Sequence, residues 1–124
     1  MILKSDGKWS IQEQAGHLLD LEELWRARVE DFVNGAKQLT AADLSNRGTD
    51  EANHNASELA CILKKFRGAR LKLLERLEKI DLRILGNTLL HPRLQQPMRF
   101  VDHLVFVAEH DDHHLVRMWE LSKK

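Results

Sequence analysis

Residues 10–35, SIQEQAGHLLDLEELWRARVEDFVNG, decide the fold of this chain. Ser10 and Glu13 have the spacing of a helix capping box, in which each side chain accepts a hydrogen bond from the other residue's backbone N–H. Apolar side chains then recur at intervals of three and four residues: Ile11, Ala15, Leu18, Leu21, Trp25, Val29 and Phe32. This period predicts one amphipathic helix from about 10 to 34, ending near Gly35 because glycine commonly terminates helices.

Two further helices are predicted farther along the chain. An apolar stripe indicates a helix over about 56–79, and a long run with scarce glycine and proline indicates another over about 99–121. The polar stretch 45–55 and the proline-containing stretch 81–98 are interpreted as loops. The sequence therefore predicts an all-α fold with three long helices, in a single domain over residues 1–124.

The last predicted helix is apolar on two faces. One side carries Val107, His110, His114 and Met118. Roughly the opposite side carries Val101, Leu104, Val105, Ala108, Leu115 and Trp119. A helix of this kind is usually buried on both sides, yet only two other long helices are available to bury it. This mismatch predicts either self-association through the spare face or a missing helix.

Composition excludes several classes of protein. Lys and Arg number 19 and Asp and Glu number 19, so the chain lacks the basic excess typical of nucleic-acid-binding proteins. No apolar run approaches the roughly 18 residues of a membrane span, and the first residues become polar too early for a secretory signal. Cys61 is the single cysteine, so no intrachain disulfide forms, which favours a cytoplasmic protein.

Histidine is abundant, and two of the seven are candidates for metal ligands. His110 and His114 are four residues apart, which places both imidazoles on one helix face, close enough for one ion. His113 is rotated from that face by about 80° and is not expected to bind the same ion. The HExxH pattern of zinc peptidases is absent, since Asp111 and Asp112 follow His110. A metal site and a chance pair in a histidine-rich chain both remain open interpretations.

His17 is the best candidate for a third ligand, because it lies at the edge of the first apolar stripe. A histidine at the edge of the core that donates to a backbone carbonyl is the alternative interpretation. Three imidazoles from two helices would suit zinc, nickel, iron(II) or copper, and not magnesium or calcium. Such a site leaves positions open for water or substrate, as catalytic sites do. Asp20 is either an acceptor for a ligand imidazole or a solvated surface charge.

The remaining histidines have less definite roles. His54 and His91 fall in predicted loops, from which either can reach the site. His103 shares a face with His110 two turns away, about 10.5 Å along the axis. It is expected to gate the mouth of the site, to support a ligand, or simply to pack.

Two stretches of the sequence resemble a known family. Lys8-Trp9-Ser10-Ile11 followed by Gly16–Glu22 resembles the WS…HLxDxE box of the DinB/YfiT-like superfamily. The run His91–Leu94 and the segment Ala108–Leu115, with its HxxHH pattern, are similar to that superfamily's closing region and last helix. The resemblance extends over about residues 8–121.

This resemblance implies a four-helix, up-down-down-up bundle that holds a divalent metal, usually nickel or zinc, through three histidines. Carried over to this chain, the ligands are His17, His110 and His114. Members are described as metal-dependent hydrolases or as transferases acting on low-molecular-weight thiols, and dimers are common. We therefore expect a metal-dependent enzyme with a small-molecule substrate, and no nucleic-acid or membrane partner. A non-catalytic metal- or small-molecule-binding module is the alternative, and a helical interaction protein is a third.

The chain departs from the family pattern before Trp9. Family members usually carry a further helix before the tryptophan–serine box, and the residues that precede it here are too few to form one. We therefore expect the usual first helix to be absent, or lost through a misplaced start codon, and a symmetric homodimer to complete the bundle.

Overall fold

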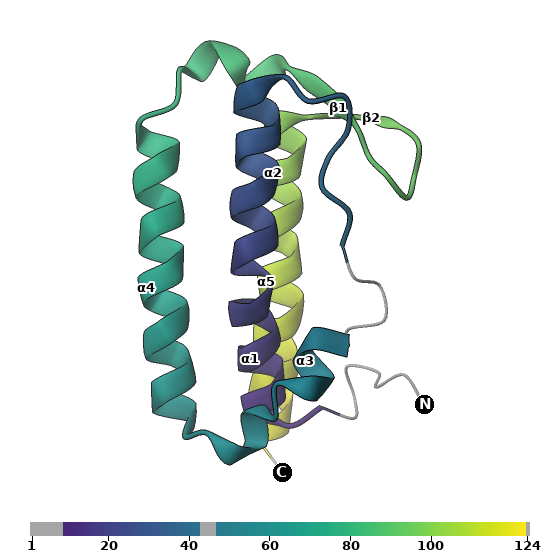
Figure 1. The fold of residues 1–124 in the computed structure, drawn as a ribbon. Helices are drawn as coiled ribbons and strands as arrows, with labels where there is room; N and C mark the ends of the chain where they lie inside the picture. Colours follow the sequence, from purple (N-terminus) through teal and green to yellow (C-terminus); the bar gives the residue numbers. More distant parts are fainter. Residues whose placement is uncertain (1–8, 43–46, 124) are drawn as a thin grey trace.

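The first predicted helix is present as two consecutive segments. The computed structural model describes residues 9–42 and 47–123, and within it α1 (Ile11–Asp20) and α2 (Glu22–Asn34) follow one another as one column (Figure 1). The predicted capping box at the start of α1 is confirmed, with the Glu13 backbone N donating to Ser10 Oγ at 3.1 Å. Gly35 ends α2 in the left-handed region, at φ 65°, which glycine adopts without strain.

The other two long helices also agree with the sequence-based prediction. They are α4 (Leu59–Glu78) and α5 (Phe100–Ser122). In Figure 1, α1, α2 and α4 run upward and α5 runs downward, so α4 follows a long crossover rather than a tight turn. α1 and α2 pack against both α4 and α5, whereas α4 and α5 hardly touch each other. The all-α class and the three long helices are thus confirmed.

Both segments interpreted as loops contain short elements, so that interpretation was wrong for part of each. The elements are α3 (Arg47–Glu51), η2 (His54–Ala56), η3 (Leu82–Gly86) and the antiparallel strands β1 (Thr88–Leu90) and β2 (Pro97–Arg99). Elements of three to five residues are too short to produce a hydrophobic period, which is why the sequence pattern did not reveal them. Residues 45 and 46 of the first loop lie outside the described residues.

The apolar core occupies one end of the bundle. It is formed by Trp25, Val29, Phe32, Leu39, Leu73, Leu89, Phe100 and Val107. Phe32 of α2 and Phe100 of α5 stack with ring centroids 4.7 Å apart. The hairpin of β1 and β2 covers this end (Figure 1), which leaves the α1 end of the interface with α5 for polar side chains.

One face of α5 is buried and the opposite face is exposed. His103, Val107 and His114 are buried, whereas Val105, Leu115 and Trp119 are 52%, 52% and 59% exposed. The expected burial of α5 on both sides is therefore not seen within one chain, because no element among the described residues covers the second face.

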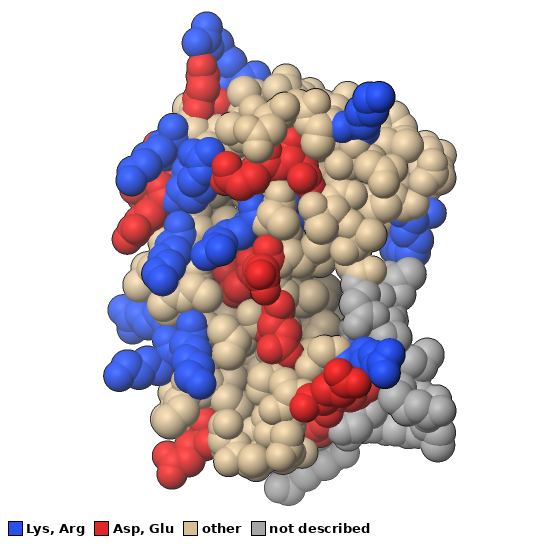
Figure 2. Space-filling view, in the orientation of Figure 1, with Lys and Arg blue, Asp and Glu red and all other residues tan. Residues whose placement is uncertain are grey.

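Charge is unevenly distributed on the surface although the chain is neutral overall. Figure 2 shows lysine and arginine side chains gathered over α4, with acidic side chains beside them toward the middle of this face. Across residues 9–42 and 47–123, no helix is both long enough and apolar enough to cross a membrane.

Candidate metal centre

Three histidines from the two ends of the chain meet between α1 and α5. One ring nitrogen from each of His17, His110 and His114 lies within 4.8 Å of the others. The ring centroids are 4.7 Å apart for His17 and His114, and 4.6 Å apart for His110 and His114. His17 and His114 are buried and His110 is half-buried. The structure therefore brings together the three side chains that the sequence proposed as ligands, and it leaves one side of the cluster accessible.

Hydrogen bonds orient the His17 ring. The Thr49 hydroxyl donates to Asp20 Oδ2 at 2.8 Å, so its oxygen accepts from His17 Nδ1, 3.1 Å away. With the proton on Nδ1, the neutral ring carries its lone pair on Nε2, as a metal ligand requires. An acceptor behind a ligating imidazole is the usual support of such sites.

The His114 ring is oriented in the same manner by Gln14. Gln14 is fully buried, and its Oε1 lies 2.6 Å from His114 Nδ1. A carbonyl oxygen only accepts, so Nδ1 donates and the lone pair of the neutral ring is on Nε2. Gln14 precedes His17 by three residues on α1 and so shares its face. That spacing was a usable signal, which the sequence analysis missed.

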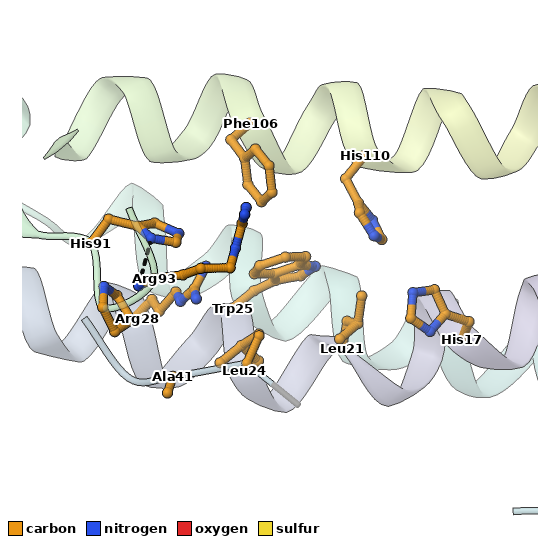
Figure 3. A pocket seen from close by; sticks show the side chains of 12 residues that line it. His17, Leu21, Leu24, Trp25, Arg28, Ala41, His91, Arg93, Phe106 and His110 are labelled. Atoms are coloured by element: carbon orange, nitrogen blue, oxygen red, sulfur yellow. Dashed lines mark hydrogen bonds between the residues drawn. The ribbon is translucent and has the colours of Figure 1, made fainter. Parts of the chain in front are cut away.

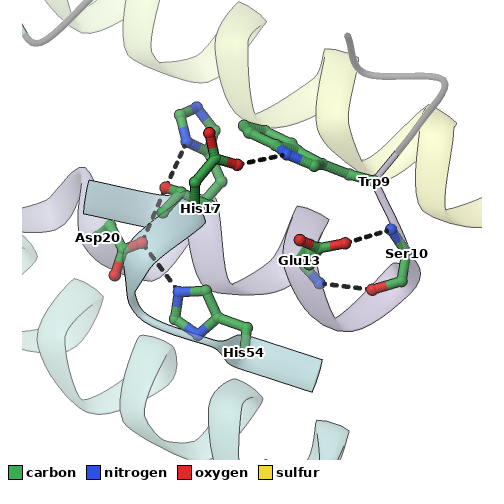
Figure 4. A network of polar contacts seen from close by, with 8 residues as sticks. Trp9, Ser10, Glu13, His17, Asp20 and His54 are labelled. Atoms are coloured by element: carbon green, nitrogen blue, oxygen red, sulfur yellow. Dashed lines mark hydrogen bonds and ion pairs between the residues drawn. The ribbon is translucent and has the colours of Figure 1, made fainter. Parts of the chain in front are cut away.

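A second layer of contacts holds Asp20 and completes the network in Figure 4. Asp20 Oδ2 also contacts His54 Nε2 at 2.9 Å, and His54 is buried. Asp20 thus supports His17 through Thr49 and does not itself accept from a ligand imidazole, so it matches neither of its two sequence-based interpretations. The His54 ring lies directly on Gly16, where a Cβ atom would collide with it. Glycine at position 16 is therefore needed for this approach.

Trp9 covers the cluster on the side of the α1 N-terminus. Its ring stacks over His114 with centroids 6.2 Å apart and lies 4.8 Å from the His17 ring. Its Nε1 donates to Asp50 Oδ1 at 3.4 Å, which ties it to α3 (Figure 4). Trp9 is 2% exposed, so this wall of the cluster is closed to solvent.

The donor set fits a transition metal ion. The grouped ligand atoms are imidazole nitrogens, which suit zinc, nickel, iron(II) and copper better than magnesium or calcium. His113 is exposed on α5, outside the grouped atoms. The nearby carboxylate of Asp111 is bound by Arg70 Nη1 at 2.6 Å. Arg70 also binds the buried Glu22, whose pKa is raised by burial despite this partner, and so it joins α2, α4 and α5 beside the site.

A cavity of about 480 Å³ extends from the histidines along the α1–α2 column. In Figure 3, His17 and His110 lie at one end and His91, Arg28 and Arg93 lie at the other. Between them stand apolar walls formed by Leu21, Leu24, Trp25 and Phe106. The sequence placed His91 in a loop from which it can reach the site. In the structure His91 lines the cavity, but at the end far from the three histidines.

His103 does not join the cluster. It is fully buried, with its ring 5.7 Å from that of Trp25 and 6.1 Å from that of Phe32. Neither of its ring nitrogens has a hydrogen-bond partner among the described residues. Burial, with smaller contributions from Arg28 and His91, lowers the pKa of His103 to about 4. Of its three expected roles, the structure supports packing.

Comparison with known proteins gives a family and nothing narrower. No curated protein and no solved structure matches the chain. A family model described as DinB superfamily matches residues 4–117, which include His17, His110 and His114. With the helical bundle and the histidine cluster in place, this match over most of the chain shows that the protein belongs to the DinB superfamily.

Proposed function

We propose that this protein is a metal-dependent enzyme that holds a divalent transition metal ion through His17, His110 and His114. The observation that carries the proposal is the grouping of three ligand atoms within 4.8 Å, with His17 and His114 oriented from behind by Thr49 and Gln14. Zinc and nickel are the proposed metals. The proposed reactions are hydrolysis or transfer of a low-molecular-weight thiol to a small molecule.

The residues around the three histidines each have a defined role in this proposal. Thr49 and Gln14 keep the two Nδ1 protons in place, so that Nε2 of each ring is ready to bind. A divalent ion bound there supplies a Lewis acid, which lowers the pKa of a water or thiol beside it. The cavity has room for a small molecule beside the half-buried His110, against the apolar side chains of Trp25 and Phe106. Trp9 closes the opposite side.

A non-catalytic binding module is the second candidate, and one observation favours it. None of the twelve residues that line the cavity is an aspartate or a glutamate. In the part of the chain that the structure describes, the cavity lining therefore offers histidines and no carboxylate as a general base. Under this alternative, the protein binds metal and a small molecule without converting it.

Turnover that depends on metal separates the two candidates. The protein is loaded with zinc or with nickel, and its activity is measured on nitrophenyl esters, on anilides, and on an aryl halide with cysteine or glutathione. The enzyme proposal expects activity that is lost with chelator and restored by metal. Full metal loading without turnover of any of these substrates would favour the binding module.

We also propose that two copies of the chain associate through the exposed side of α4 and α5. A groove of about 260 Å³ separates these helices, and it is flanked by Leu74 on α4 and Leu104 on α5. Further exposed apolar side chains stand on both helices: Leu63, Leu71, Val105, Leu115, Val116 and Trp119. Exposed apolar surface of this extent usually marks an interaction site, and a chain with zero net charge does not repel its own copy.

Light scattering after size-exclusion chromatography tests the homodimer. Wild type is expected at twice the monomer mass, and a Leu115→Glu, Trp119→Glu double variant at the monomer mass. Leu82→Glu, at an exposed position on η3, is the matched control and should leave the dimer intact. A monomeric wild type overturns the proposal.

The neutral charge and single cysteine support our further proposal of a cytoplasmic protein without a nucleic-acid or membrane partner.

A further inference from the structure

The far end of the cavity gathers cationic side chains. Arg28, His91 and Arg93 line this end, and within residues 9–42 and 47–123 no aspartate or glutamate lines the cavity. Figure 3 shows the two arginines reaching toward the space between His91 and Trp25. Cationic side chains gathered in a concave, largely apolar pocket are an arrangement that fixes an anionic group of a ligand.

Arg28 is built into this end rather than left on the surface. The residue is 2% exposed, its Nε donates to Thr40 O at 2.9 Å, and its guanidinium lies 5.7 Å from the Trp25 ring centroid. Among residues 9–42 and 47–123, no carboxylate forms an ion pair with Arg28. The nearby Asp31 is occupied by the backbone N and the hydroxyl of Thr40. Nε thus has a structural role, and the two Nη groups remain as charged donors.

His91 supplies a neutral donor beside the arginines. Its Nδ1 accepts from the backbone N of Arg93 and of Leu94, both at 3.2 Å. The ring proton is therefore on Nε2. Burial, with Arg28 and Arg93 close by, lowers the pKa of His91 and favours this neutral form.

We infer that Arg28, His91 and Arg93 form a subsite for the anionic group of an elongated organic acid whose other end reaches the three histidines. This inference rests on the proposed function for the reacting end and adds the substrate class. His17 and Arg28 are eleven residues apart on nearly continuous helix, about 16 Å along its axis. The intervening wall of Leu21, Leu24 and Trp25 calls for an apolar middle portion in the ligand.

Binding to the metal-free protein tests the subsite separately from the metal. In the presence of a chelator, the affinity for 4-phenylbutyrate is compared with that for its neutral analogue 4-phenylbutyramide, by calorimetry or ligand-observed NMR. The carboxylate is expected to bind about tenfold more tightly, the contribution of one or two charge-assisted hydrogen bonds. Equal affinities, or no binding of the carboxylate at its solubility limit, overturn the inference.

Variants assign the preference to these residues. Arg93 is exposed, so Arg93→Gln should fold, bind the acid several-fold more weakly and bind the amide as wild type does. Arg28→Gln should lose more of the preference, and it is informative only if its circular dichroism matches wild type. Arg67→Gln, an exposed arginine on α4 outside the cavity, is the control with the same charge change. An Arg93→Gln variant that weakens the acid and the amide equally contradicts the inference. Whether the histidines bind metal is measured separately as metal content. A failure there does not change the affinity comparison, which uses metal-free protein.

Discussion

The buried histidines of this bundle differ in the hydrogen-bond partners of their ring nitrogens. His17 and His114 each have an oxygen acceptor at Nδ1, from Thr49 and Gln14 respectively. His103, which is even more deeply buried, has aromatic neighbours and no hydrogen-bond partner at either nitrogen among the described residues. His103 and His114 both lie on the buried face of α5, so the helix pattern alone does not separate a candidate ligand from a core histidine.

Hydrogen-bond partners at Nδ1, rather than burial, therefore distinguish a candidate ligand from a core histidine. An acceptor at Nδ1 fixes the tautomer and presents Nε2 to a common point. A ring without partners remains neutral because protonation inside an apolar core is costly. Substitutions at the proposed ligands, at their hydrogen-bond partners and at His103 test this contrast.

Removal of two ligands should abolish metal binding. Wild type is expected to carry about one equivalent of zinc or nickel per chain, and the His110→Ala, His114→Ala double variant almost none, because one imidazole alone does not hold the ion. Mass spectrometric metal analysis of untagged protein measures this. His113→Ala, an exposed histidine on the same helix, is the control and should retain its metal. Equal metal content in wild type and the double variant would contradict the proposed metal site.

Loss of the acceptor behind His17 should weaken metal binding without removing a ligand. Thr49→Val keeps the shape of the side chain and deletes the hydroxyl between His17 and Asp20. Affinity is expected to fall about 10- to 100-fold, the usual effect of losing such a partner, as measured by competition with a chelating dye. Thr88→Val, at an exposed strand position, is the control. Unchanged affinity would show that the hydrogen bond does not position the ring.

His103 should affect acid stability instead. Its pKa falls from an ordinary 6.5 to about 4 on folding, so the unfolded chain takes up the proton first and stability falls as the pH drops from about 6.5 toward 4. Arg28 and His91 act in the same direction, and Asp31 opposes them. Between pH 7 and pH 5 this amounts to about 2 kcal/mol.

Urea unfolding with chelator present measures the effect at both pH values. His103→Leu should lose less stability than wild type on going from pH 7 to pH 5, because leucine has no proton to gain. The pH dependence that the rest of the chain contributes is common to both proteins and cancels in the difference. An identical pH dependence in the two proteins would mean that His103 is protonated, or solvated, in the native state.

The smallest effect is expected one contact farther from the ligands. His54→Ala removes a partner of Asp20 but leaves Thr49 bound to the same carboxylate, so the loss of metal affinity should be less than about tenfold. Gly16→Ala should act in the same direction, because its Cβ displaces the His54 ring. If His54→Ala lost more metal affinity than Thr49→Val, His54 rather than Thr49 would be the more important support of the ligands.

The sequence predicted the elements with strong local signals. Ser10 and Glu13 specify the start of α1, and the apolar period of three and four residues specifies its buried face. His110 and His114 share a face through the helix repeat alone. The short α3 was missed, because a five-residue helix has no measurable period. Thr49 on that helix was missed for the same reason, since its approach to His17 depends on the crossover and not on spacing.

The cavity was also beyond reach of the sequence. Arg28 lies on the predicted first helix, but its neighbours Thr40 and His91 come from separate connections. Burial of an arginine runs against its ordinary surface preference. Only the packed structure shows that its charge faces a concavity.

The proposed ligands come from α1, near the start of the chain, and from α5, near its end. An ion shared by them would close a loop of nearly the whole polypeptide, much as a long-range crosslink does. In the unfolded chain the three imidazoles are not held together, which makes it a far weaker chelator, so the ion would favour the folded state by mass action. Metal addition should therefore raise the melting temperature of the protein. The ion should contribute to the stability of a folding intermediate only after α1 and α5 have packed together.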